Sequence, residues 1–116
     1  MKFMTSKPVV AQASVADCER GDLMQLDSGV VAKQATTGAL YGVAFTSTDE
    51  NGLVDVALEG IVLVDLGGVS VGDTVYVENG AITASSAGGS SFGIVIALES
   101  SSQCQVHFQG LPMRSL

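Results

Sequence analysis

The chain has 116 residues, of which 47% are apolar and 15% charged, with 14 glycines and no tryptophan. This composition excludes intrinsic disorder and predicts one packed domain over residues 1–116 that needs no disulfide or metal to fold. The formal net charge is −7, and no lysine or arginine lies between Lys33 and Arg114. Because phosphate groups require clustered lysine or arginine, the chain is not expected to bind nucleic acid or anionic membranes, and we expect protein partners.

Residues 1–8 precede the first strand pattern and are expected to form an extended arm. They contain Met1, Phe3 and Met4 but no apolar segment typical of a signal peptide. No part of the chain reaches the roughly 18 apolar residues of a membrane span. We therefore expect a soluble protein made in a cytoplasm, where cysteines stay reduced.

Two tandem repeats, residues 9–59 and 60–110, are expected to follow. The glycines that define them are Gly21 and Gly72, Gly29 and Gly80, Gly38 and Gly89, and Gly42 and Gly93, each pair 51 positions apart. Apolar residues between these glycines alternate with a period of two, in the same register in both repeats. Such short alternating runs separated by turn residues are typical of β-strands, so the sequence predicts an all-β fold.

Each repeat is expected to hold about five strands, with hairpin turns at Ser28-Gly29 and Asn79-Gly80. A repeat of this size buries too little surface alone, so the two are expected to share a core as a small β-barrel or sandwich about a pseudo-two-fold axis. The four consecutive aliphatic residues 61–64 indicate a strand that joins the halves and is covered on both faces.

The last strand of the second repeat is expected to bury Cys104 in the place of a valine and to turn His107 away from the core. Cys18 and Cys104 are interpreted as unbonded small apolar residues. Residues 111–116 lie outside the repeat and are expected to form a second arm. The candidate partner-binding residues of the two arms are Met1, Phe3, Met4, Leu111, Met113 and Leu116.

No catalytic, cofactor-binding or metal-binding residue is predicted, and we expect the chain not to be an enzyme. One histidine cannot supply a ligand set or an acid–base pair. The glycine-rich segment 67–74 lacks the lysine of a phosphate-binding loop and is interpreted as a turn. The Gly-Asp pairs at 21–22 and 72–73 are interpreted in the same way, with the Asp side chain bonded to a nearby N–H. The acidic segment 49–51 lacks the spacing of a calcium loop.

The segments GDTVYVENGAIT (72–83), FGIVIALE (92–99) and VHFQG (106–110) resemble the small capsid decoration, or cement, proteins of tailed bacteriophages. The resemblance covers mainly residues 8–110. It implies a β-rich, usually trimeric subunit that binds the outside of the head shell where capsomers meet, with the major capsid protein as partner. It brings no site residues with it.

Two alternatives remain open at this point. One is a ligand- or carbohydrate-binding β module, although only Tyr76 is an aromatic residue at an outward strand position. The other is a structural component of a phage tail or baseplate.

Overall fold

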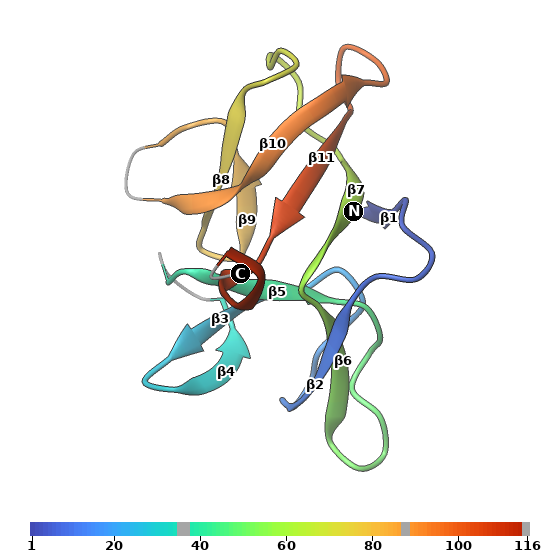
Figure 1. Ribbon diagram of the computed structural model, residues 1–116, viewed down its shortest axis with the longest axis vertical. Helices are drawn as coiled ribbons and strands as arrows, with labels where there is room; N and C mark the ends of the chain where they lie inside the picture. The colour runs from blue at the N-terminus through green and yellow to red at the C-terminus, as the bar shows by residue number, and fades with distance from the viewer. Residues whose placement is uncertain (35–37, 87–88, 115–116) are drawn as a thin grey trace.

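The computed structural model describes residues 1–34, 38–86 and 89–114 and contains two antiparallel sheets (Figure 1). The first sheet consists of β2 (Val10–Ser14), β3 (Leu23–Asp27), β4 (Val30–Lys33), β5 (Leu40–Ala44) and β6 (Leu53–Ala57). The second consists of β1 (Lys2–Phe3), β7 (Glu59–Val64), β8 (Thr74–Glu78), β9 (Ala81–Thr83), β10 (Ser90–Leu98) and β11 (Cys104–Gln109). One helical turn, α1 (Leu111–Arg114), follows in this part of the chain. The predicted all-β class is confirmed.

The two sheets have the same strand order. The first runs β2-β6-β5-β3-β4, and the second, apart from β1 at its edge, runs β7-β11-β10-β8-β9. The second set of strands begins at Glu59, one residue before the predicted boundary. The loops predicted around Gly38 and Gly89 run through residues 35–37 and 87–88, which lie outside the described residues.

The pairing register repeats as well. Leu23 pairs with Val43 in the first sheet, and Thr74 pairs with Ile94 in the second. Both sheets carry a register shift at the same place, between β3 and β5 and between β8 and β10. Residues 51 positions apart, or 50 in the last strand of each repeat, therefore occupy equivalent positions.

Equivalent turns connect the strands. Ser28 and Gly29 have φ values of 51° and 80°, and Asn79 and Gly80 have values of 52° and 80°. Two consecutive positive φ angles define the type I′ turn, whose twist matches that of the flanking strands. Both predicted hairpins are confirmed.

The Gly-Asp pairs close a second set of equivalent turns. The backbone N of Glu19 donates to Asp22 Oδ2 at 2.9 Å, and the backbone N of Ser70 donates to Asp73 Oδ2 at 2.8 Å. These bonds hold the chain just before β3 and β8. The turn interpretation of the two Asp residues is confirmed.

Gly42 and Gly93 allow neighbouring strands to approach closely. A Cβ atom at Gly42 would collide with the carbonyl oxygen of Ala57, and one at Gly93 with that of His107. Ala57 and His107 are themselves equivalent residues in the last strand of each repeat. The recurrence of glycine at this position therefore has a steric cause.

A central core joins the two repeats. Its buried members are Phe3, Leu23, Leu40, Val43, Ala57, Val62, Val64, Val75, Val77, Phe92, Val95, Cys104, Val106 and Phe108. The second repeat contributes the face that carries Val75, Val95 and Val106, which we call the inner face. The first repeat contributes Leu23 and Val43, which lie on its opposite, or outer, face.

The inner face of the first repeat forms a separate cluster. Its buried members are Cys18, Met24, Ala44, Val54 and Val56. Their equivalents are Val69, Val75, Val95, Cys104 and Val106, which all belong to the central core or pack against it. Figure 1 shows β5 of the first repeat lying across the end of the second sheet.

The relation between the repeats is therefore head to tail, and the predicted pseudo-two-fold axis is wrong. A two-fold axis would bring the same face of both repeats together. Instead, the outer face of the first repeat fills the open end of the inner face of the second.

β7 also differs from its prediction. It continues from β6 and joins the two sheets, as expected, but of its four consecutive aliphatic residues only Val62 and Val64 are buried. Ile61 and Leu63 are half-buried, because no layer of the described structure covers their face of the strand completely. Consecutive aliphatic residues here do not indicate burial on both faces.

Candidate interaction surfaces

The N-terminal segment follows the edge of the second sheet instead of extending from it. Lys2 and Phe3 pair with Leu63 and Val62 of β7. Two residues later, Thr5 Oγ1 accepts a hydrogen bond of 2.9 Å from the backbone N of Ile61. Residues 2–5 are thus held against β7 by hydrogen bonds.

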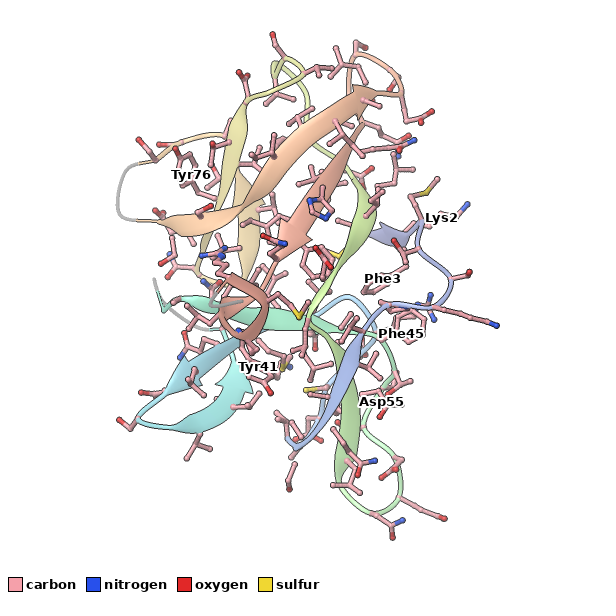
Figure 2. All side chains as sticks on the ribbon, in the orientation of Figure 1. Lys2, Phe3, Tyr41, Phe45, Asp55 and Tyr76 are labelled. Carbon is pink, nitrogen blue, oxygen red and sulfur yellow. The ribbon has the colours of Figure 1, made fainter. Side chains whose placement is uncertain are left out.

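Phe3 is a core residue, which corrects its prediction as a partner-binding side chain. It is only 9% exposed and packs edge-to-face on Phe45, with ring centroids 5.0 Å apart, and on Phe108 at 6.4 Å. The Arg20 guanidinium lies 4.5 Å from the centroid of Phe45 and 5.3 Å from that of Phe3. Figure 2 shows Phe3 and Phe45 side by side. The ring removes more apolar area from water here than it would on a free arm.

Met1 and Met4 are exposed apolar residues of this segment. The two residues are 44% and 46% exposed, on either side of the buried Phe3. They remain candidates for contact with a partner.

The C-terminal segment is likewise folded against the body up to Arg114. Leu111 and Met113 are half-buried in α1, so residues 111–114 do not form an extended arm. Arg114 Nη2 donates to the carbonyl oxygen of Ser91 at 2.8 Å and Nε donates to that of Gln109 at 2.8 Å. Leu116, the last predicted arm residue, lies outside the described residues.

His107 turns away from the core, as predicted. Its side chain is 41% exposed, and Nε2 lies 3.3 Å from Glu59 Oε2. The same carboxylate oxygen accepts a hydrogen bond of 2.8 Å from Gln109 Nε2. Beside this pair is an open hollow of about 280 Å³, lined in part by Thr5, Lys7 and His107. A volume this small does not enclose a drug-sized ligand.

In the acidic segment 49–51, the Asp49 carboxylate bonds to backbone N–H groups of its own loop. Asp49 Oδ1 accepts hydrogen bonds from the backbone N of Asn51 at 2.8 Å and of Leu53 at 3.0 Å. Within residues 1–34, 38–86 and 89–114, no group of three or more His, Cys, Asp or Glu side chains is placed to hold a metal ion. No helix in these ranges is long and apolar enough to cross a membrane.

The two cysteines are free thiols in different clusters. Burial raises the pKa of both Cys18 and Cys104 above the ordinary value of a thiol. Since the thiolate is the reactive form, this environment is that of a structural cysteine.

One exposed apolar surface was not predicted from the sequence. Ile94 and Ile96 of β10 are 48% and 40% exposed, and Val71, in the turn before β8, is 61% exposed. Ile94 and Ile96 stand 51 positions after the apolar residues Val43 and Phe45, and this repeat pattern suggests a buried face. A usable signal was present, because Thr74 stands at the position of Leu23 and marks this face as more polar in the second repeat.

No protein-family model matches the sequence, and no curated protein is significantly similar to it. The fold and surface define an all-β protein of two alike sheets that share a core. Among the described residues, its exposed apolar side chains include Met1 and Met4 of the N-terminal segment, and Ile94 and Ile96 on the outer face of the second repeat.

Proposed function

We propose that the chain is a structural virion protein that binds the outer surface of a phage capsid and reinforces the contacts between capsomers. In this proposal its partner is the major capsid protein, and the subunit acts as a homotrimer on the shell. It is made in the cytoplasm of the host bacterium. It performs no catalysis.

The observation that carries the proposal is the number of large apolar side chains in water. Among the described residues, ten are at least 40% exposed: Met1, Met4, Val9, Val10, Leu26, Val30, Val71, Ile94, Ile96 and Leu98. Scattered apolar residues are normal, but apolar side chains concentrated along strands and at a chain end favour contacts with other proteins.

The charge distribution supports a protein partner over a nucleic acid. The net charge is −7, and the segment between Lys33 and Arg114 has no lysine or arginine. Such a body offers no cluster of cations to replace the counterions of a phosphate backbone. The resemblance to capsid decoration proteins, which covers mainly residues 8–110, supports the same conclusion.

Attachment is assigned to the exposed side chains of the terminal segments. Met4 is 46% exposed beside β1, and Met113 is half-buried on α1. Both can lose further area to a shell without leaving the fold. Phe3 has no part in attachment because it is needed in the core.

The test is decoration of purified undecorated shells by Met4→Glu, Met113→Glu and the double variant. Val30→Glu is the matched control, since Val30 is 62% exposed at a hairpin remote from both ends of the chain in sequence. Deletion of residues 1–6 is a poorer test because it also removes Phe3 from the core. We expect weaker occupancy for the double variant and full occupancy for the control. Full occupancy for the double variant would place attachment elsewhere.

Electron microscopy of intact particles separates this proposal from the alternatives. Density for the chain on the head, at the junctions of capsomers, is the expected result. Density on a tail or baseplate would favour the second structural role, and absence from particles would contradict the proposal.

A further inference from the structure

The head-to-tail packing inside the chain leaves one face of each repeat without a partner. In the central core, the outer face of the first repeat covers the inner face of the second. The outer face of the second repeat has no such cover in the described structure, and the inner face of the first is closed at its centre by its own sheet but open at the end that carries Leu26. These two surfaces are the equivalents of the two that already fit together.

The outer face of the second repeat is exposed where its counterpart is buried. Ile94 is 48% exposed, whereas its equivalent Val43 is 0% exposed. Ile96 is 40% exposed, whereas its equivalent Phe45 packs against the central core. Both isoleucines retain the apolar character that the buried position requires.

The inner face of the first repeat shows the complementary difference. Leu26 is 40% exposed, whereas its equivalent Val77 is 0% exposed. Tyr41 is half-buried, whereas its equivalent Phe92 is 0% exposed. The cluster around Met24 is thus closed at its centre and open at the end that a further outer face would cover.

The hairpin tips follow the same pattern. Inside the chain, the tip of the second hairpin contacts the first repeat, because the backbone N of Gly80 donates to Gln34 Oε1 at 2.7 Å. The equivalent tip at Gly29 is exposed, with no atom within 4 Å of the position that a Cβ would take. The rim of the open inner face is therefore also free.

We propose that the outer face of the second repeat in one copy packs on the open inner face of the first repeat in another copy. The occupant of each surface is thus a second copy of this chain. The contact reproduces the one that joins the repeats within the chain, with Ile94 in the role of Val43 and Leu26 in the role of Val77. It uses two different surfaces, so it is heterologous and forms a ring or an open chain according to its rotation.

The outer face of the second repeat also carries polar residues, as suits a contact that forms only after each copy has folded. Thr74 and His107 occupy the positions of Leu23 and Ala57, which are 4% and 0% exposed. They keep the surface soluble before the copies meet. Arg114 lies at its edge, bonded to Ser91, and leaves Ile94 exposed.

The experiment measures mass by light scattering and sedimentation at several protein concentrations, with no shell present. The intact chain is expected to be larger than a monomer. Ile94→Glu places a charge on the outer face of the second repeat, and Leu26→Glu places one on the inner face of the first. Each variant is expected to associate at least about tenfold more weakly than the intact chain. Val30→Glu, on the opposite face of the Leu26 hairpin, is the control and should associate like the intact chain.

Mixing the two variants distinguishes this contact from a symmetric one. Each variant retains the surface that the other lacks, so an equimolar mixture is expected to form dimers with one intact interface. Circular dichroism checks that both variants are folded, and the milder Ile94→Ser and Leu26→Ser variants repeat the test. A monomeric intact chain, undiminished association of the variants, or a mixture that stays monomeric would each overturn the proposal. Because shells are absent, these results are independent of those for capsid binding.

Discussion

Equivalent side chains of the two repeats have different surroundings, and this difference determines what each one does. Val54 and Cys104 both lie inside their sheets, at 1% and 0% exposure, so valine and cysteine serve the same packing role. Ala57 and His107 occupy equivalent positions on outer faces, yet one is buried and the other reaches water. At this position the residue type follows the surroundings: alanine inside the central core and histidine where the face is open.

Cys104→Val is expected to change the free energy of unfolding at pH 7 by less than about 1 kcal/mol relative to the intact chain, because volume-conserving apolar exchanges are tolerated in cores. It should also reduce the loss of stability at alkaline pH. Burial raises the pKa of Cys104 in the folded state. The contribution of the thiol to the free energy of unfolding is therefore fully present below the unfolded pKa of about 8.5. This contribution is lost as the pH rises through the folded pKa. Urea unfolding at pH 7 and at about pH 9.5 checks both points, and an unchanged alkaline loss would contradict the second.

His107→Ala is expected to change the free energy of unfolding by no more than about 0.5 kcal/mol, the range of surface sites. The side chain is 41% exposed, and a pair in that position contributes little. Glu59 keeps its hydrogen bond from Gln109 in the variant. Thermal unfolding is the measurement, and a large drop in melting temperature would show a contribution that the exposed geometry does not account for.

Among the elements, the two-residue strand β1 is anchored to its sheet mainly by the side chain of Phe3. Its pairing with β7 involves only Lys2 and Phe3, and so short a strand is not stable on backbone hydrogen bonds alone. Phe3 anchors it by inserting between Phe45 and Phe108.

Phe3→Ala is expected to lower the free energy of unfolding by about 3 kcal/mol, near the low end of buried Phe to Ala changes. Met4→Ala, next in the chain but 46% exposed, is the matched control and should cost less than about 0.5 kcal/mol. Chemical denaturation with tryptic digestion of the N-terminal segment follows both stability and detachment. Equal effects of the two substitutions would mean that β1 is not anchored through its ring.

At the scale of the whole molecule, the central core couples the repeats into one folding unit. Its buried members come from both sheets, and Phe3 crosses to them from the N-terminus. A repeat of about 50 residues buries too small a fraction of its surface to be stable alone. A substitution that weakens the contact between the repeats should therefore destabilise both of them.

Val43→Ala tests this coupling, because Val43 is 0% exposed and lies on the face of the first repeat that fills the second. The expected loss is about 2 kcal/mol of unfolding free energy. Hydrogen exchange should show reduced protection in β8 and β11 as well as in β5, since the units open together. Reduced protection confined to the first sheet would show two independently unfolding parts.

The all-β class, the strand positions and the two hairpins could be predicted from the sequence because their signals are local. Period-two alternation reports which residues share a face, and Asn79-Gly80 carries its turn preference within two residues. The recurrence of Gly42 as Gly93 likewise indicates equivalent positions in the two repeats, and the structure supplies the steric reason for it.

Only the tertiary structure decided which faces meet. Alternation divides a strand such as β10 into two faces but does not state what covers each, so Val43 and Ile94 look alike in sequence and differ completely in burial. Phe3 was assigned to a free arm for the same reason, since its contacts with Phe45 and Phe108 join distant parts of the chain. Local pattern determined the strands, whereas packing over long sequence separations determined the core, the position of the N-terminus and the surfaces left open.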